Sequence, residues 1–187
     1  MRKLLSIAII MQFALGIMHC NAQRVQSPDG NIVVNFSLDG TRPCYTVDYK
    51  GKAVVKPSHL GLQLAKGGAD LMEGFSVTDT KASSFDETWT PVWGEESSIR
   101  NNYNELAVTL TQNAKSNETI TNYDGSKSQV GGKRTIIIRF RVFNDGVGFR
   151  YEFPDGQPLV HFVIKEELTE FNCAQDNTAW WIPGDFD

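Results

Sequence analysis

The sequence predicts an all-β fold, an antiparallel β-sandwich, and three features of residues 23–187 indicate it. Short segments alternate between apolar and polar residues, which is the period of a half-buried strand. Turn signals rich in Gly, Asn, Asp and Pro separate these segments. No stretch of about 12 residues keeps an apolar stripe at helical spacing. The 165 residues that remain of the 187 after position 22 are enough for one domain with its own core.

Three strands are expected near the start of this domain. Residues 31–38 form an apolar-rich run between two turns that contain glycine. Residues 44–49 alternate with a period of two, and a shorter run at 53–55 ends before Pro57. Strands joined by such short turns predict an antiparallel meander.

The clearest prediction is a hairpin made by residues 135–143 and 148–153. Both runs alternate, and Asn144-Asp-Gly between them is a turn signal. In the first run, one face carries Ile136, Ile138, Phe140 and Val142, and the other carries Ile137, Arg139, Arg141 and Phe143.

Four further segments complete the predicted layout. Residues 106–112 are expected to be a strand that pairs with the hairpin, and residues 161–165 another strand. The polar stretch 113–133 is expected to be a long, mobile hairpin loop. Residues 169–173 are predicted to form at most one helical turn.

Residues 1–22 have the pattern of a secretory signal peptide. A positively charged start precedes an apolar run, and small residues precede the Ala22–Gln23 bond. The apolar run, about 15 residues, is short for a membrane span, which needs roughly 20. Lipidation of Cys20 is an alternative, but His19 before it fits that pattern poorly. We therefore expect an exported, periplasmic protein with no membrane attachment after cleavage, and an outer-membrane lipoprotein or a secreted protein as alternatives.

Charge and cysteine content exclude some classes of protein. The whole chain has 18 basic and 22 acidic residues; without the leader it has 16 and 22, a net charge of −6. With no basic patch in the sequence, nucleic acid is not an expected partner. Cys44 and Cys173 could form one disulfide in an oxidising compartment, but two small buried thiols are the simpler interpretation.

No complete catalytic or metal site is visible in the sequence. A zinc site needs several His or Cys ligands, and His59, His161, Cys44 and Cys173 lack ligand spacing. A nucleophilic Ser or Cys would need a partner His and a strained turn, and neither is apparent. The glycine pairs at 67–68 and 131–132 lack the strand-to-helix context of a phosphate loop and are expected to be turns.

Residues 85–105 are the densest in chemistry, with two Trp, one Tyr, five carboxylates, one Arg and three Asn. Sugars are recognised by such residues, because aromatic rings cover the C–H face while carboxylates and amides bond the hydroxyls. Glu95 and Glu96 are adjacent, so on a strand they would point to opposite faces and make a poor catalytic pair. The alternative is a β-bulge or loop with two core Trp and a solvated acidic rim.

The chain resembles the N-terminal domain of glycoside hydrolase family 97, which contains exported bacterial exo-acting α-glucosidases and α-galactosidases. The similarity is greatest to the calcium-dependent α-glucosidases of starch utilisation, and it covers nearly the whole of 23–187. The stretches that carry it are Ser27-Pro-Asp-Gly, Lys56-Pro-Ser-His-Leu-Gly-Leu, Phe85-Asp-Glu-Thr-Trp-Thr-Pro-Val-Trp-Gly-Glu-Glu, Arg100-Asn-Asn-Tyr-Asn-Glu-Leu, Phe143-Asn-Asp-Gly-Val-Gly-Phe-Arg-Tyr-Glu-Phe and Trp181-Ile-Pro-Gly-Asp.

The resemblance implies a β-supersandwich, of which residues 23–187 are an incomplete part, followed in the family by a catalytic (β/α)₈ barrel. It implies that the catalytic residues lie in the barrel. Calcium is expected in the full-length enzyme, held by barrel glutamates and one glutamate just past Trp181-Ile-Pro-Gly-Asp. This chain stops at Asp187, so we expect it to hold no complete calcium site. The aromatic-rich ending, 179–187, also resembles a truncation more than a natural terminus.

Nine residues are the expected substrate-binding or barrel-facing set: Asp86, Glu87, Trp93, Glu95, Glu96, Arg100, Asn102, Tyr103 and Asn104. The alternative is that they only hold the sandwich together. The favoured hypothesis is the non-catalytic front of an exo-α-glycosidase that acts on α-linked oligosaccharides and is inactive without its barrel. A free-standing carbohydrate-binding sandwich and a structural remnant are the alternatives. Unpaired sheet edges and an exposed Trp180-Trp181 predict aggregation of the isolated chain.

Overall fold

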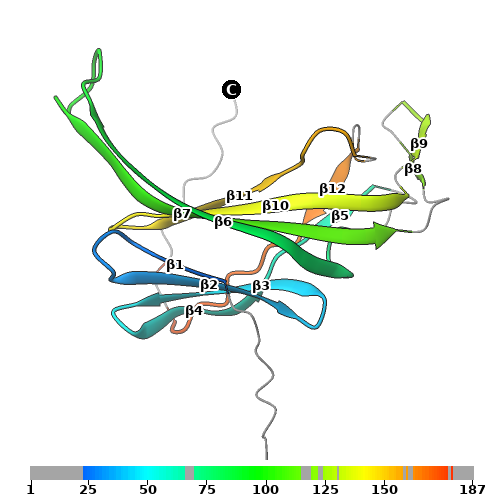
Figure 1. The fold of residues 1–187 in the computed structure, drawn as a ribbon, viewed down its shortest axis with the longest axis horizontal. Coiled ribbons are helices and arrows are strands. Elements are labelled where there is room, and N and C mark those ends of the chain that lie inside the picture. The colour runs from blue at the N-terminus through cyan, green and yellow to red at the C-terminus, as the bar shows by residue number, and fades with distance from the viewer. Residues whose placement is uncertain are drawn as a thin grey trace, which may run out of the picture.

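All regular elements in the described part of the chain are β-strands, which confirms the predicted fold class. Two four-stranded antiparallel sheets lie one above the other (Figure 1). Among the described residues, no helix is long and apolar enough to cross a membrane. The predicted leader, His161, Trp180-Trp181 and the glycine pair at 67–68 lie outside these residues. The computed structural model describes residues 23–65, 70–114, 119–121, 124–129, 131–157, 159, 162–176 and 178.

The first sheet is the predicted meander, in the order β1-β2-β3-β4. Its strands are β1 (Gln23–Gln26), β2 (Ile32–Asp39), β3 (Arg42–Tyr49) and β4 (Lys52–His59). The prediction that the last strand ends before Pro57 is wrong. Tyr45 pairs with Ser58 and Val47 with Val55, so the proline falls at an irregularity of an outer strand, where its missing N–H costs no regular ladder bond.

The second sheet has the order β11-β10-β7-β6. Its strands are β6 (Phe75–Trp89), β7 (Ile99–Ala114), β10 (Gly132–Val142) and β11 (Val147–Glu152). The predicted hairpin is confirmed, with Phe140 opposite Phe149 and a turn in which Phe143 N donates to Gly146 O at 2.8 Å. Strand β6 was not predicted, and β7 begins seven residues before the predicted strand 106–112.

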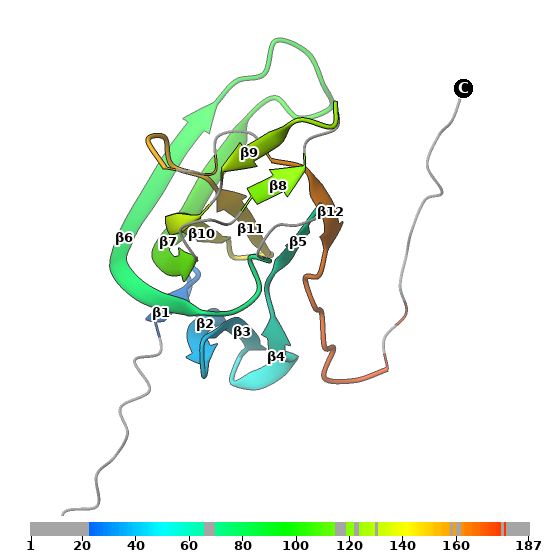
Figure 2. The same cartoon turned by 90° about the vertical axis from the view of Figure 1, so that its right-hand side faces the viewer.

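Smaller elements correct two further predictions. The stretch 113–133 contains a short hairpin of β8 (Thr119–Thr121) and β9 (Lys127–Gln129), so it is not wholly a loop. Strand β12 (Ile164–Glu167) pairs with β5 (Leu62–Leu64). The helical turn expected at 169–173 is wrong, because this segment runs beside β4 and Cys173 forms a bridge with Val55 (Figure 2).

The core lies between the two sheets and matches the predicted alternation. Ile136, Ile138, Phe140 and Val142 are all buried, as predicted for one face of β10. They pack against buried side chains of the first sheet, including Phe36 and Tyr45, whose rings lie 6.2 and 6.1 Å from that of Phe140. Burial of these aromatic and branched side chains is the main term that holds the sheets together.

Both cysteines are free thiols. Cys44 is buried in β3, where burial raises its pKa, as expected for an inert thiol. Cys173 is exposed, so the expectation of two buried thiols is confirmed only for Cys44. The segment that carries Cys173 runs along the edge of β4, where Cys173 forms a bridge with Val55.

Ile137 and Ile138 provide a matched test of the sandwich on one strand. Ile138 is 0 % exposed in the core, whereas Ile137 lies on the opposite, partly exposed face. We expect Ile138→Val to lower the free energy of unfolding by about 1 kcal/mol, since it removes a methylene group from a packed core. Ile137→Val should cost about 0.5 kcal/mol or less. Urea denaturation followed by circular dichroism measures both, and equal losses would contradict the assigned faces.

Candidate functional site

All nine residues predicted for the site lie on one projecting hairpin, which we call the arm and define as residues 84–104. Asp86 and Glu87 lie in β6, the residues from Arg100 onward in β7, and the remaining three in the connection at 90–98. The arm extends beyond the first sheet and curves away from it (Figures 1 and 2). At its base, Asn104 Nδ2 donates to the carbonyl oxygen of Gln26 in β1 at 2.8 Å.

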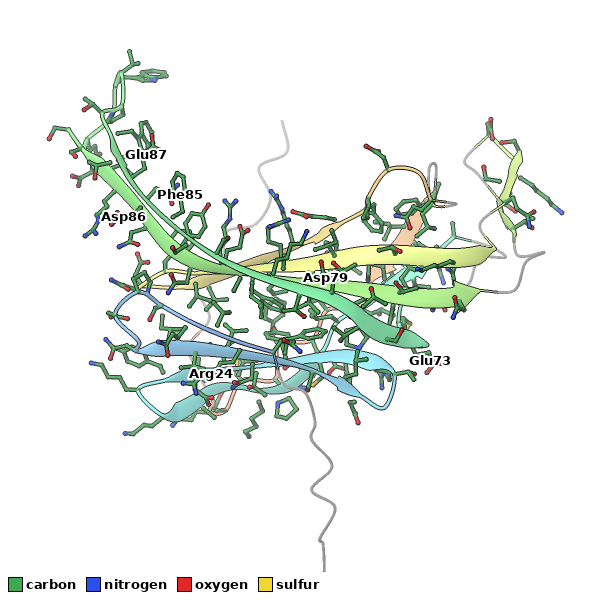
Figure 3. The ribbon with its side chains drawn as sticks, viewed as in Figure 1. Arg24, Glu73, Asp79, Phe85, Asp86 and Glu87 are labelled. Atoms are coloured by element: carbon green, nitrogen blue, oxygen red, sulfur yellow. The ribbon has the colours of Figure 1, made fainter. Side chains whose placement is uncertain are left out.

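The arm has two chemically different faces because its ladder is regular. Phe85 pairs with Tyr103, Asp86 with Asn102, and Trp89 with Ile99, without a register shift. Side chains therefore alternate between the faces. Asp86 points to one side and Phe85 and Glu87 to the other (Figure 3). The polar face consists of Ser84, Asp86, Thr88, Arg100, Asn102 and Asn104, and the aromatic face of Phe85, Glu87, Trp89, Ile99, Asn101 and Tyr103.

The polar face is organised by a bidentate ion pair between Asp86 and Arg100. Arg100 Nε lies 2.8 Å from Asp86 Oδ1, and Nη2 lies 2.6 Å from Oδ2. These hydrogen bonds lower the pKa of Asp86 and raise the pKa of Arg100. Both side chains are exposed, so the pair adds little to stability. It does fix a planar guanidinium and an ionised carboxylate in one orientation, a geometry suited to hydrogen-bonding a polar ligand.

The aromatic face joins the arm to the outer surface of the second sheet. The rings of Phe85 and Tyr103 stack at 5.4 Å between centroids, and Phe143 lies 5.2 Å from Tyr103. Arg141 places its guanidinium 4.5 Å from the centre of the Tyr103 ring, a cation–π contact. Tyr103 is thereby buried, and it connects the side chains of the arm with those of the sheet.

The alternative of a loop with two core Trp is wrong. Trp89 is 46 % exposed and Trp93 is 90 % exposed, because the hairpin projects beyond the core. Glu95 and Glu96 are also exposed in the connection. Gly94 supplies a positive φ of 133° there, a conformation that other residues rarely adopt. The tip therefore presents an indole ring and two carboxylates to solvent.

A charged network that sequence analysis did not assemble lies beside the aromatic face. Arg139 donates to both oxygens of Glu152, at 2.6 and 2.8 Å, and also to Glu105. Arg141 Nε donates to Glu105 at 2.8 Å, and Arg150 Nε to Glu152 at 2.7 Å. The alternation of 135–143 places Arg139 and Arg141 on one face, but their partner on β7 is more than 30 residues away in sequence. The arginines of this network, with Phe143, Gly148 and Phe149, line a hollow of about 200 Å³.

The two glutamates of this network are held ionised. Hydrogen bonds from Arg139 lower the pKa of Glu152 to about 2. Burial acts to raise the pKa of Glu105, but the hydrogen bonds from Arg141 and Arg139 outweigh it, so this pKa is also lowered. Carboxylates with depressed pKa values are poor proton donors near neutral pH, so the network serves to position groups.

His59 belongs to a separate cluster that ties the segment after β12 to the first sheet. Its Nε2 lies 3.1 Å from Asp39 Oδ2, and its Nδ1 lies 3.0 Å from Glu170 Oε2. The backbone N–H of His59 also donates to Glu170, which lowers the pKa of that carboxyl. Within the described ranges, no group of three or more His, Cys, Asp or Glu residues could hold a metal ion. The contacts of His59 hold the two segments together.

The network predicts a loss of stability in acid. The pKa of Glu152 is about 2 in the folded chain and 4.5 ordinarily, so its stabilising effect is complete above pH 4.5 and is lost as the pH falls towards 2. We expect Glu152→Gln to be less stable than the wild type at pH 7, with a smaller further loss between pH 4.5 and 2. Urea midpoints across that range measure this. Exposed Glu166→Gln is the control, and a wild-type acid profile in Glu152→Gln would contradict the role of the network.

Comparisons with known proteins agree with the fold. A family model described as "Glycosyl-hydrolase 97 N-terminal" matches residues 25–187. Two structures of a family 97 enzyme from Pseudoalteromonas sp. strain K8, one with panose and one with acarbose, match with a TM-score of 0.71 and 33 % identity. Each match covers 87 % of this chain and 22 % of the enzyme. This chain therefore spans about a fifth of the enzyme that it matches.

A β-arabinopyranosidase structure is also similar in fold. Its TM-score is 0.62 at 24 % identity, over 80 % of this chain and 21 % of that protein. At this level of identity the similarity supports the fold alone. The family match, the Pseudoalteromonas structures and the two-sheet architecture together show that the chain belongs to glycoside hydrolase family 97, as its N-terminal domain.

Proposed function

We propose that this chain is the non-catalytic N-terminal domain of an exported exo-α-glycosidase. The parent enzyme would be similar to the α-glucosidases and would act on starch-derived, α-linked oligosaccharides. The observation that carries the proposal is the combination of a family match over 25–187 and a coverage of only 22 % of a 33 % identical enzyme. In this proposal the arm packs on the catalytic barrel and borders its sugar pocket.

The composition of the arm supports a place beside a sugar. The polar face offers a fixed guanidinium and carboxylate in Arg100 and Asp86, together with the amides of Asn102 and Asn104. Trp93 at the tip is exposed and provides a ring of the kind that covers the C–H face of a pyranose. The Pseudoalteromonas enzyme was solved with panose and with acarbose, which supports an oligosaccharide ligand for the parent enzyme.

Export and calcium belong to the proposal as properties of the parent enzyme. The leader pattern at 1–22 supports export to the periplasm. Calcium would be held mainly by glutamates of the catalytic barrel, together with one glutamate just past Trp181-Ile-Pro-Gly-Asp, as the resemblance to the calcium-dependent members of the family implies. We therefore assign no step of the reaction to calcium bound by this chain.

A chimera tests whether this chain serves as the front of such an enzyme. Residues 23–187 would replace the matching part of the Pseudoalteromonas enzyme. We expect the chain alone, and the truncated enzyme alone, to leave p-nitrophenyl α-glucoside and panose intact in the presence of calcium. The chimera should hydrolyse them. Hydrolysis by the chain alone, or a folded but inactive chimera, would contradict the proposal; binding of maltotriose by the chain alone would favour a free-standing sugar-binding domain.

Substitution of Arg100 in the same chimera tests whether the polar face borders the sugar. Loss of a charge-assisted hydrogen bond to the substrate costs at least about 1.5 kcal/mol, which is roughly tenfold. We therefore expect Arg100→Ala to raise KM for panose by about tenfold. Lys81→Ala removes an exposed cation on the neighbouring strand β6, outside the arm, and should leave KM unchanged. Equal KM values for the two variants would show that the polar face does not border the sugar.

A further inference from the structure

The apolar residues on the two paired strands of the arm are segregated in a way that the sandwich does not require. Phe85, Trp89, Ile99 and Tyr103 all lie on the aromatic face, and each position of the opposite face is polar. None of the four belongs to the hydrophobic core between the sheets. A two-stranded ribbon is at best marginally stable in water. An apolar stripe along one of its sides therefore indicates that another protein surface packs on it.

Three of these residues are exposed in the isolated chain. Phe85 is 39 %, Trp89 46 % and Ile99 36 % exposed. The base of the stripe is already fixed in place, because Tyr103 stacks on Phe85 and contacts the guanidinium of Arg141. Rigid aromatic side chains of this kind lose little conformational freedom when a partner covers them.

The outer surface of the second sheet continues this stripe, and the charged residues of the network on it are paired with one another. Glu105 is paired with Arg139 and Arg141, and Glu152 with Arg139 and Arg150. A partner that covers this network meets ion pairs that are already formed, so these charges do not have to be buried unpaired. Because the arm curves away from the first sheet, the stripe and the network lie on the concave side (Figure 1).

We infer that the aromatic face of the arm, together with the network of Glu105, Arg139 and Glu152, is the contact surface for the catalytic domain, while the polar face on the other side of the hairpin is left free to border the sugar. The inference rests on the proposed function, and it assigns opposite roles to the two faces of one hairpin. The occupant is a protein domain because about four-fifths of the matched enzyme lies outside the region covered by this chain. A sugar is the weaker candidate, because the polar groups beside the stripe are already bonded to one another.

Trp89→Lys in the chimera tests this contact surface, with Ile164→Lys as its matched control. The two residues are 46 % and 45 % exposed, and Ile164 lies on β12, away from the arm (Figure 1). We expect Trp89→Lys to lower the chimera's activity at least tenfold and to split its single calorimetric unfolding transition into two. The control should change neither. The isolated chain with Trp89→Lys should keep the wild-type urea midpoint, because the residue lies outside the core.

Each result separates the inference from the proposed function. An inactive wild-type chimera would overturn the proposed function. If the chimera is active and Trp89→Lys behaves as Ile164→Lys, the inferred contact between the aromatic face and the catalytic domain is wrong, while the proposed function still stands. A raised KM in Trp89→Lys with an unsplit transition would show that the aromatic face binds the sugar, and would equally overturn the inference.

Discussion

The register of strand β7 is the constraint on which the rest of the structure depends. This one strand of 16 residues runs from the sandwich into the arm without interruption. Its alternation places Leu106, Val108 and Leu110 in the core. The same alternation places Tyr103 and Glu105 on the outer surface. A shift of one residue would exchange the two sets, bury a carboxylate between the sheets and destroy both the core and the charged network.

Strand order and core faces could be predicted wherever apolar alternation is strong. The faces of β10 and the turn after it follow from Ile136 to Gly146 alone. Strand β6 could not be predicted, because residues 78–84 are almost entirely polar or small and the strand is formed by pairing with β7. The sequence likewise left a β-bulge or loop as an alternative for 85–105. An outer strand with little burial carries no hydrophobic signal of its own.

The candidate site was predicted in composition but not in geometry. The density of Trp, Asn and carboxylates at 85–105 identified the arm, and all nine residues lie on it. The pairing of Asp86 with Arg100 spans the hairpin, and that of Glu105 with Arg139 joins two strands that are distant in sequence. Such contacts depend on register and sheet order, which the local pattern does not contain. The separation into a polar and an aromatic face followed only once the ladder was known.

Hydrogen–deuterium exchange tests most directly whether another domain completes the surface of the arm. Exchange of residues 85–103 would be compared between the isolated chain and the chimera, with β2 and β3 as internal references. We expect the arm to exchange rapidly in the isolated chain and at least tenfold more slowly in the chimera, while the references stay unchanged. Equal exchange of the arm in both would contradict its role as the contact between the domains.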